Sequence, residues 1–521
     1  MLAAPVLAVG AWLRAGTAPW HTNLWAIDWL SYYEPQAEAL ASLHLWRWAG
    51  SWEGLHPPFS GVVHGTLMTL GAGLGVQWAA TVTAGLVAAA LVGWMVQEAG
   101  AKDAHPAVAT GAALAAVSVL ALSPFQANYG LNTSPYPWAL LTTAGAMAAL
   151  WAARRSTATG PWVVAGLLSG LAIQTHVLAF AAVIGQGCWL TLHGRALWRE
   201  ARAGLVRWGA IVGLFALPMV IGSLLKTSDP WTFHIDPQEE PWWRTAAMVL
   251  NERFGDRTTA SSLGAVLGTL ALFGAARQPR GVASLLSWGT VGWMAALVLF
   301  IELRVADPRL SHYYLVPQLL GVGAALAAVA EMPRKQGFGP LLLVGLVGLL
   351  WGRESLDYLE ERRQHASALL EEHAAGRAAV KAVFEQAGEG AVIAYLWDHE
   401  FLNDEPEHLD PFAAFPLSAV GRRCPEEHPP RGLCNADGSR RYTFDPSAFT
   451  GEVDEYEEPL RLLINGSEPP GRTTIVQVPG SGAPPRPFPV EEWLREHGGV
   501  LSDEGDVLIW RFPPGHRVAP P

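Results

Sequence analysis

The sequence is poor in charged residues. Only 16% of its 521 residues are Asp, Glu, Lys or Arg, whereas soluble domains average about 25%. Because 50% of the residues are hydrophobic, we expect a large part of the chain to lie in lipid. The 35 Lys and Arg residues are also outnumbered by 46 Asp and Glu residues. This balance argues against a nucleic-acid-binding protein, which depends on a basic surface.

Cysteine is scarce as well, with three residues in the whole chain and neither a CxxC motif nor the Cys/His spacing of a zinc site. Cys188 lies in an apolar segment, where a packing role is expected. Cys424 and Cys434 flank the polar stretch CPEEHPPRGLC. They can close a small disulfide loop if this part of the chain is extracytoplasmic, or remain two thiols.

The hydrophobic residues are gathered in segments rich in Ala, Leu, Gly and Val that end near Trp351. Helices satisfy their own backbone hydrogen bonds in lipid, so these segments predict membrane helices. The apolar stretch Met1–Leu13 is shorter than the roughly 20 residues that a crossing needs. The predicted helices are Pro58–Leu74, Val76–Val96, Ala107–Leu122, Tyr136–Ala153, Trp162–Gln174, Val177–Leu192, Trp208–Leu225, Thr259–Ala275, Val282–Ile301, Tyr313–Ala330 and Phe338–Trp351.

Basic residues alternate between the connections. One set of short connections is rich in them, and the positive-inside rule makes that set cytoplasmic. This set holds Lys102, Arg154, Arg155, Arg195, Arg199, Arg202, Arg207, Arg277, Arg280, Arg334 and Lys335. The alternation holds only if Pro58–Leu74 dips into the outer face without crossing. About eleven crossings then remain if the apolar start Met1–Leu13 belongs to a longer first crossing, with the Trp20–Ser60 loop and the C-terminal part outside.

The pattern changes near residue 353. Leu356–Gln386 is a charged, amphipathic helical stretch, and strand-like runs follow at Ala391–Leu396, Thr474–Val478 and Val507–Phe512. The sequence therefore predicts a mainly α, polytopic membrane domain over residues 1–352 and a small periplasmic α/β domain over residues 353–521. Residues 14–75 would form the first outer loop, with interfacial or re-entrant helices.

The Trp20–Ser60 loop carries the residues best suited to chemistry. Asp28 stands among aromatic residues that include Tyr32 and Tyr33. Partial desolvation there can raise the pKa of its carboxyl group and suit it to take a proton from an acceptor hydroxyl or amine. The alternative is that Asp28 caps an interfacial helix over Trp29–Leu43.

Two other polar residues of the loop leave alternatives open. Glu34 is six residues beyond Asp28, so on a helix it faces roughly the opposite side and can be a solvated acid. Two carboxylates also allow a divalent cation, although no third ligand is evident. His56, before Pro57 and Pro58, can contact a phosphate or the acceptor, or simply form a rigid turn.

Two further outer segments hold possible binding residues. Arg309 precedes the aromatic run His312, Tyr313 and Tyr314, and its guanidinium suits capture of a lipid-linked phosphate or an interfacial anchor. His176, in a tight connection after Gln174, can line an acceptor cleft or have a loop role.

At these residues the chain resembles the GT-C membrane glycosyltransferases. The nearest group is the bacterial branch similar to dolichyl-phosphate-mannose–protein mannosyltransferases and lipid A aminoarabinose transferases (family 39-like). The matching stretches, in chain order, are IDWLSYYEPQAEAL, HPPF, LSPFQANYGLNTSPYPWALL, GLLSGLAIQTHVLAF and DPRLSHYYLVPQLLGVGAALA. They cover the chain from Met1 to about Trp351.

The resemblance implies an inverting transfer at the outer face of the bacterial inner membrane. The donor would be a polyprenyl-phosphate sugar, and the acceptor a periplasmic protein, lipid or glycan. The loop aspartate, here Asp28, would be the base, and Arg309 with Tyr313 and Tyr314 would face the donor phosphate. The usual pair of adjacent acids is absent, because Trp29 follows Asp28, so Glu34 stays a second catalytic candidate. A lipid-linked sugar flippase and a non-catalytic membrane scaffold are the alternatives.

Overall fold

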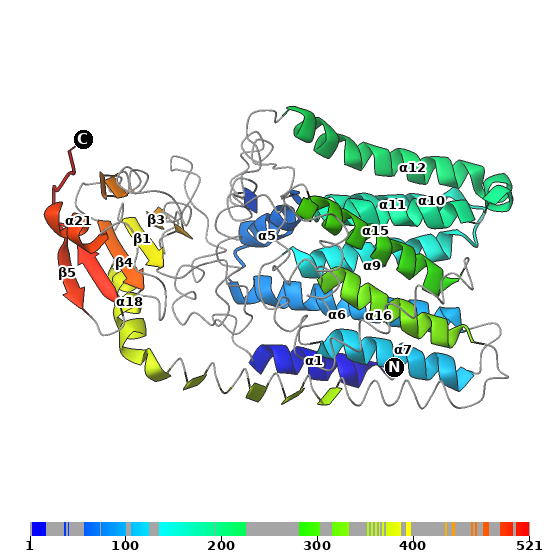
Figure 1. Cartoon of the computed structure of the whole chain (residues 1–521), viewed down its shortest axis with the longest axis horizontal. Helices are drawn as coiled ribbons and strands as arrows, with labels where there is room; N and C mark the ends of the chain where they lie inside the picture. The colour runs from blue at the N-terminus through cyan, green and yellow to red at the C-terminus, as the bar shows by residue number, and fades with distance from the viewer. Residues whose placement is uncertain are drawn as a thin grey trace. The chain divides into compact units, whose positions relative to one another are not determined.

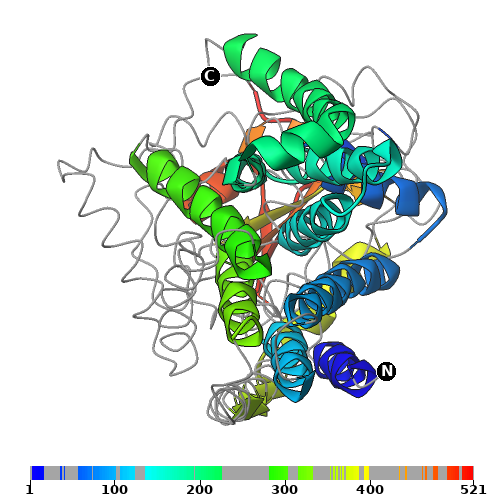
Figure 2. The same cartoon turned by 90° about the vertical axis from the view of Figure 1, so that its right-hand side faces the viewer.

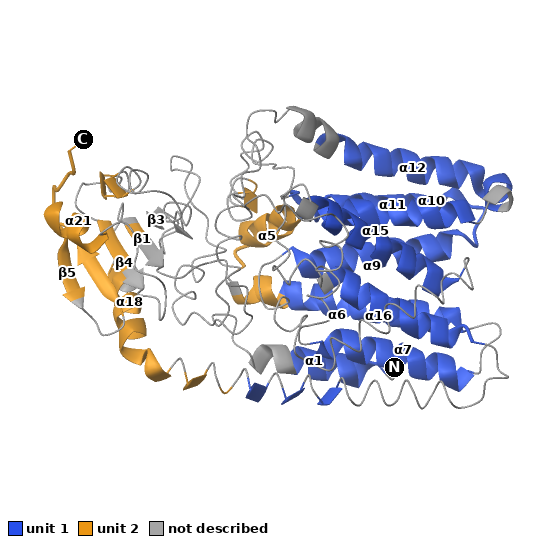
Figure 3. Ribbon diagram, in the orientation of Figure 1, with its two compact units in different colours: residues 1–17, 52–59, 80–362 blue, residues 18–51, 60–79, 363–521 orange. Residues whose placement is uncertain are grey.

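The computed structural model describes the following part of the chain. It covers residues 3–16, 36–37, 40, 57–72, 74–100, 106–123, 135–192, 194–225, 281–302, 315–332, 352–353, 356–357, 360–361, 364, 367–368, 371–386, 392–397, 433–434, 440–442, 460–461, 464–465, 473–478, 490–503 and 507–519. The chain divides into two units, coloured separately in Figure 3. The first comprises residues 1–17, 52–59 and 80–362, and the second comprises residues 18–51, 60–79 and 363–521.

Long apolar helices with broadly aligned axes make up the first unit (Figure 1, Figure 2). Helix α10 packs on α9 and α12, α11 packs on α15, and α16 packs on α15 and α7. The helices are α1 (Ala4–Gly16), α6 (Leu74–Ala99), α7 (Pro106–Leu122), α9 (Tyr136–Ala153), α10 (Thr159–Ile173), α11 (Val177–Leu192), α12 (Gly194–Leu225), α15 (Val282–Glu302) and α16 (Leu315–Ala330).

Small residues let some of these helices approach closely. A Cβ atom at Gly185 of α11 would collide with the backbone of Trp288, and one at Gly292 of α15 with the backbone of Ala181. Between apolar helices in lipid, this close approach replaces the hydrophobic driving force that water supplies. The α11–α15 pair is therefore fixed by glycine from both sides.

Three described helical stretches are long and apolar enough to cross a membrane, namely Gly75–Ala99, Leu197–Pro218 and Val282–Phe300. The chain is therefore a mainly helical, multi-pass membrane protein. The predicted segments Thr259–Ala275 and Phe338–Trp351 lie outside the described residues, so the predicted number of crossings stays a prediction.

Helix α5 (Phe59–Thr69) is shorter than the predicted segment Pro58–Leu74. The chain turns at Gly71, whose φ of 79° is in the left-handed region that glycine favours. At about 1.5 Å per residue, an 11-residue helix falls well short of a bilayer core of about 30 Å. Its length fits a helix that does not cross.

Helix α12 differs most from its prediction, Trp208–Leu225. It begins at Gly194 and is bent at Ala201, where the backbone is non-helical (φ −128°, ψ 24°). Hydropathy missed the first turns because they are rich in arginine. They still form a helix because Leu197 and Ala201, one turn apart, are both buried.

One end of the first unit, which we call the arginine end, gathers charged residues where helices terminate. Arg155, after α9, forms a 2.9 Å ion pair with Glu98 near the end of α6. Glu331, after α16, accepts a 3.2 Å hydrogen bond from the backbone N–H of Ala283 at the start of α15. Burial raises the pKa of Glu331 to about 7, although backbone hydrogen bonds and the Arg154 guanidinium act to lower it.

The described part of the C-terminal region contains a four-stranded sheet in the order β1-β4-β6-β5. Strand β1 pairs with β4 in parallel, and the other two pairings are antiparallel. The strands are β1 (Val392–Trp397), β4 (Thr473–Val478), β5 (Val500–Asp503) and β6 (Leu508–Arg511), beside the short pair β2 (Leu433–Cys434) and β3 (Arg440–Tyr442). Three of the four sheet strands were predicted, and β5 was not. Cys424 lies outside the described residues, so its disulfide with Cys434 stays a prediction.

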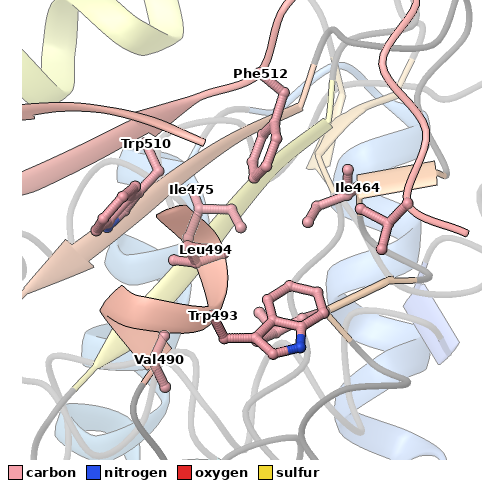
Figure 4. Packing of buried hydrophobic residues seen from close by; sticks show 9 residues of the cluster. Ile464, Ile475, Val490, Trp493, Leu494, Trp510 and Phe512 are labelled. Atoms are coloured by element: carbon pink, nitrogen blue, oxygen red, sulfur yellow. The ribbon is translucent and has the colours of Figure 1, made fainter. Parts of the chain in front are cut away.

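Helices α18 (Ala374–Gln386) and α21 (Val490–Glu496) accompany this sheet. The predicted helix Leu356–Gln386 contains α18, and no helix was predicted at α21. Figure 4 shows the core of this region, where Trp493 and Leu494 of α21 pack with Ile475, Trp510 and Phe512. Consecutive residues are buried in the two central strands, Ile475 with Val476 in β4 and Ile509 with Trp510 in β6, so both faces of the sheet are covered there.

Candidate functional site

The His-Pro-Pro-Phe turn is held by a contact with a second predicted motif, Gln-Thr-His. The backbone N–H of Phe59 donates a 2.9 Å hydrogen bond to the carbonyl oxygen of Gln174. Pro57 and Pro58 have no N–H groups to satisfy, and both are buried. Phe59 therefore carries the first backbone donor after the prolines. Two stretches that are far apart in the sequence meet at the start of α5 and the end of α10.

Gln174 makes a further contact, with helix α12. It follows α10 directly, and its side-chain amide donates a 2.6 Å hydrogen bond to the carbonyl oxygen of Phe215. Pro218 lies in the same turn of α12 and has no N–H to give to the preceding turn. The amide of Gln174 thus adds a donor from outside the helix to a carbonyl oxygen in the turn that contains Pro218. Gly170 leaves room for the Phe215 ring against α10.

His176 is buried between two aromatic rings. Its ring stacks on Trp293 of α15 with centroids 5.5 Å apart, and lies 5.0 Å from the ring of Tyr136 at the start of α9. The Nδ1 atom accepts a 3.2 Å hydrogen bond from the backbone N–H of Leu178 in the first turn of α11. The neutral ring therefore carries its proton on Nε2. His176 both caps α11 and orders two aromatic side chains.

Two threonines extend the same cluster. The Thr142 hydroxyl donates to the carbonyl oxygen of Trp138 at 2.8 Å and lies 3.3 Å from the hydroxyl of Thr175. The ring of Trp138 meets that of Phe59 edge to face, with centroids 6.4 Å apart. We call this region the aromatic end; its members are Phe59, Tyr136, Trp138, Thr142, Gln174, Thr175, His176 and Trp293.

The chain direction sets the aromatic end opposite the arginine end. Helix α9 starts at Tyr136 and ends beside Arg154, whereas α10 runs back from Thr159 to Gln174. Members of the aromatic end supply aromatic faces and uncharged hydrogen-bonding groups. Most of these side chains are buried in contact with one another, so they order this end of the bundle, and a base or a cation must come from elsewhere.

Part of the first loop contacts α5. A Cβ atom at Gly61 would collide with the side chain of Gln36, and one at Gly65 with the carbonyl oxygen of Ala37. The two glycines are four residues apart, so they share one face of α5. Gln36 and Ala37 therefore lie directly against α5. One residue before Gly65, His64 Nδ1 lies 2.9 Å from the Oε1 atom of Gln77 in α6.

Of the predicted site residues, His176 is the only one within the described part of the chain. The other predicted site residues lie outside that part, namely Asp28, Tyr32, Tyr33, Glu34, His56, Arg309, His312, Tyr313 and Tyr314. Among the described residues there is no group of three or more His, Cys, Asp or Glu side chains that could hold a metal ion. The predicted divalent cation is therefore untested.

Four members of the aromatic end were given no role from the sequence: Tyr136, Trp138, Thr142 and Trp293. Tyr136 lies in a stretch that carried the resemblance, SPYPWALL, but it was given no role. Trp293 sits within the apolar segment that became α15, and nothing in its local sequence sets it apart. Its stacking on His176 depends on how α11 and α15 pack.

No protein-family model matches the sequence, and no curated protein matches it. Among solved structures, the chain is similar to ArnT from Cupriavidus metallidurans bound to undecaprenyl phosphate, with a TM-score of 0.57, 14% identity and coverage of 99% of both chains. The apo form of ArnT gives a TM-score of 0.55. The oligosaccharyltransferase of Archaeoglobus fulgidus gives 0.46 over 91% of this chain and 67% of its own, which is too weak to support an argument.

An aligned bundle of apolar helices with polar turns at one end and arginines at the other defines a polytopic membrane protein. The match to ArnT over the whole length of both chains specifies it further: the chain has the GT-C glycosyltransferase fold. The resemblance stated from the sequence is confirmed at the level of the fold.

Proposed function

We propose that the chain is a membrane glycosyltransferase that moves one sugar from a polyprenyl-phosphate carrier to an acceptor at the outer face of the bacterial inner membrane. The observation that carries this proposal is the hydrogen bond from Phe59 to Gln174, which joins the HPPF and QTH motifs at one end of a GT-C bundle. The proposed class of donor is based on the fold similarity to ArnT, whose solved structure has undecaprenyl phosphate bound.

In the proposed reaction, a carboxylate removes the proton of the acceptor hydroxyl or amine. The acceptor attacks the anomeric carbon from the side opposite the phosphate, and the bond from that carbon to the phosphate oxygen breaks. Polyprenyl phosphate leaves with both bonding electrons, and the sugar is inverted. The phosphate is already a competent leaving group, so positioning and one base suffice.

The residue roles follow the sequence predictions. Asp28 is the proposed base, and Glu34 is the alternative. Arg309 holds the donor phosphate by paired hydrogen bonds, beside His312, Tyr313 and Tyr314. His56, Tyr32 and Tyr33 are proposed to bind substrate, and His176 orders the aromatic end. The C-terminal residues 353–521 form the proposed periplasmic α/β domain, in which acceptor selection can lie.

The described spans give no support to a lipid-linked sugar flippase. A transporter of this kind places ionisable residues within its spans. Among helices α6 to α16 of the described structure, the charged residues are Glu98 at the end of α6, Glu302 at the end of α15, and Arg195, Arg199, Glu200, Arg202 and Arg207 in the first half of α12, so none is buried at the middle of a span. The transferase therefore remains the better proposal.

The test is a transfer assay on purified protein in nanodiscs, with radiolabelled polyprenyl-phosphate sugars as donors and native membrane extract as the acceptor source. Wild type, Asp28→Asn and Glu34→Gln are compared, each with and without a metal chelator. We expect label to move to an acceptor in wild type and Glu34→Gln, and transfer in Asp28→Asn to fall by a factor of roughly 10² to 10⁴, as for loss of a general base.

Each other outcome has a defined meaning. Full activity in Asp28→Asn with loss in Glu34→Gln would transfer the base to Glu34. Loss of transfer on chelation would establish the divalent cation. If no donor is used but donor crosses the bilayer in proteoliposomes, the protein is a flippase. If neither transfer nor movement occurs with any donor, the scaffold alternative stands.

A further inference from the structure

Only one face of the first turns of α12 packs against the helix bundle. Leu197 and Ala201 are buried, and Gly204 follows them on the same side, where an added Cβ atom would collide with the ring of Trp162 in α10. The Trp162 ring is itself fixed, because its Nε1–H donates a 3.1 Å hydrogen bond to the carbonyl oxygen of Ser156. This face holds the bent start of α12 in place.

The opposite face exposes an indole and two guanidinium groups. The side chain of Trp198 is 49% exposed, and the guanidinium of Arg202 lies over its ring, 5.7 Å from the centroid. Arg199 is exposed next to them. This geometry presents cations above an aromatic ring that is open on its outer side.

These arginines differ from those after α9, at the same end of the bundle. Arg155 is paired with Glu98 at 2.9 Å, and the Arg154 guanidinium packs 3.4 Å from the ring centroid of Trp151. In the part of the chain that the structure describes, Arg199 and Arg202 have no carboxylate within ion-pair distance. Their charge is therefore available to a ligand from outside the chain.

An exposed apolar strip continues from these residues along α12. Val206 is one turn beyond Arg202 and 53% exposed, and Leu217 lies three turns further on the same side and is 51% exposed. Between them, a Cβ atom added at Gly209 or Gly213 would meet nothing within 4 Å. Little of the apolar stretch Leu197–Pro218 is buried in the protein, so this strip faces lipid.

We propose that this face of α12 binds one anionic phospholipid. The acyl chains lie along Val206, Gly213 and Leu217, the Trp198 ring sits at the level of the headgroup, and Arg199 and Arg202 hold the phosphate. Arginine suits a phosphate because its N–H groups match two oxygens at once. Indole rings favour the membrane–water interface. The proposal does not depend on transferase activity.

The experiment measures lipid retention. Wild-type protein is equilibrated in mixed micelles that contain phosphatidylglycerol and phosphatidylcholine, then washed in detergent, and the retained lipid is counted by mass spectrometry. We expect phosphatidylglycerol to be retained over phosphatidylcholine, and the double variant Arg199→Gln/Arg202→Gln to lose roughly 10- to 30-fold of that preference. Trp198→Phe should retain more phosphatidylglycerol than Trp198→Ala.

Arg155→Gln is the matched control, because it removes a charge at the same end that already has an internal partner. It should keep the wild-type preference. An equal loss of the phosphatidylglycerol preference in Arg155→Gln would mean that the overall positive charge of this end attracts the lipid, which would overturn the proposed site. Unfolding in pure phosphatidylcholine and the circular dichroism spectrum should match between the double variant and wild type, so that lost retention is not lost folding.

Two further measurements test whether something other than a phospholipid binds this face of α12. Inorganic phosphate alone should neither stabilise the protein nor displace the lipid, and an equal effect of phosphate would mark a soluble-anion site instead. Light scattering should give the same mass for wild type and the double variant. A wild-type dimer that the double variant dissociates would show that a second copy covers α12, which would also overturn the proposal.

Discussion

The backbone N–H of Phe59 and the carbonyl oxygen of Gln174 are 2.9 Å apart, and through this bond the turn that opens α5 is fixed to the turn that closes α10. The same glutamine fixes α12 through its side chain, 2.6 Å from the Phe215 carbonyl oxygen. Gln174, at the end of α10, thus links that helix to α5 through its backbone carbonyl and to α12 through its side-chain amide. A change in its side chain alters one of these contacts and spares the other.

Replacing Gln174 by Met keeps the volume of the side chain and removes its amide. We expect a loss of about 0.5–1.5 kcal/mol in the free energy of unfolding, because the hydrogen bond from the side chain to the Phe215 carbonyl oxygen is removed. We also expect slower sugar transfer, since the aromatic end is held less firmly. Thermal unfolding and the transfer assay measure the two effects.

Gln186→Met is the control for this variant. Gln186 is equally buried and accepts a 2.9 Å hydrogen bond from Ser169 within the bundle, but it contacts no member of the aromatic end in the described structure. It should lose similar stability and keep the transfer rate of wild type. Equal losses of transfer in both variants would show that activity simply follows stability.

Two substitutions of His176 separate its two roles. Asn can keep the cap on the Leu178 N–H but has no ring, whereas Phe keeps a ring between Tyr136 and Trp293 but cannot accept that hydrogen bond. Loss of a cap costs about 1 kcal/mol, so His176→Phe should unfold at a lower temperature. If the aromatic stack orders the acceptor site, His176→Asn should raise the KM for acceptor more than His176→Phe does. The reverse order of KM values would contradict this role.

Gly65→Leu should displace the first loop from α5. The new side chain would meet the carbonyl oxygen of Ala37 at a position where even a Cβ atom is too close, and backbone cannot move aside cheaply. We expect overpacking to cost about 1–3 kcal/mol and transfer to fall with it. Gly75→Leu is the control, because a Cβ atom there meets nothing within 4 Å. Protease protection of the Trp20–Ser60 loop reports its position directly, and unchanged protection in Gly65→Leu would rule out the displacement.

Glu331 predicts a pH dependence of stability. Its pKa is raised from 4.5 to about 7 in the folded protein, chiefly by burial, so the folded state binds this proton more tightly than the unfolded state does. The stabilisation is complete below about pH 4.5 and is lost as the pH rises through 7. The unfolding temperature of wild type should therefore fall between pH 5 and pH 8. In Glu331→Gln, which can still accept from the Ala283 N–H, the fall should be smaller; the same slope in both would exclude this group as the cause.

Sequence reasoning placed the apolar helices well. Tyr136–Ala153 and Val177–Leu192 were predicted with the bounds that α9 and α11 have. Lipid leaves a chain few options other than helix, and Pro135, Pro106 and the Gln174–His176 turn mark where helices start and stop. The start of α12 was not predicted, because its first turns are amphipathic and a hydropathy average includes both faces of the helix.

The contacts of the aromatic end are a different matter. The stacking of His176 on Trp293 and the bond from Gln174 to Phe215 join helices whose neighbours are chosen by packing. Local pattern contains no information on which helix will lie beside which. Gly185 and Gly292, which allow α11 and α15 to approach, became meaningful only once their partners were known.

The order of the chain adds a consequence for biogenesis. The ribosome makes Phe59 well before Gln174, with α6, α7 and α9 between them, and an 11-residue helix such as α5 is too short to be recognised as a span when it emerges. The Phe59 N–H therefore lacks its Gln174 acceptor during early insertion and gains it only when α10 reaches the bilayer. A substitution in α10 that delays insertion would also delay the hydrogen bond that holds the end of the first loop, although no residue of that loop is changed.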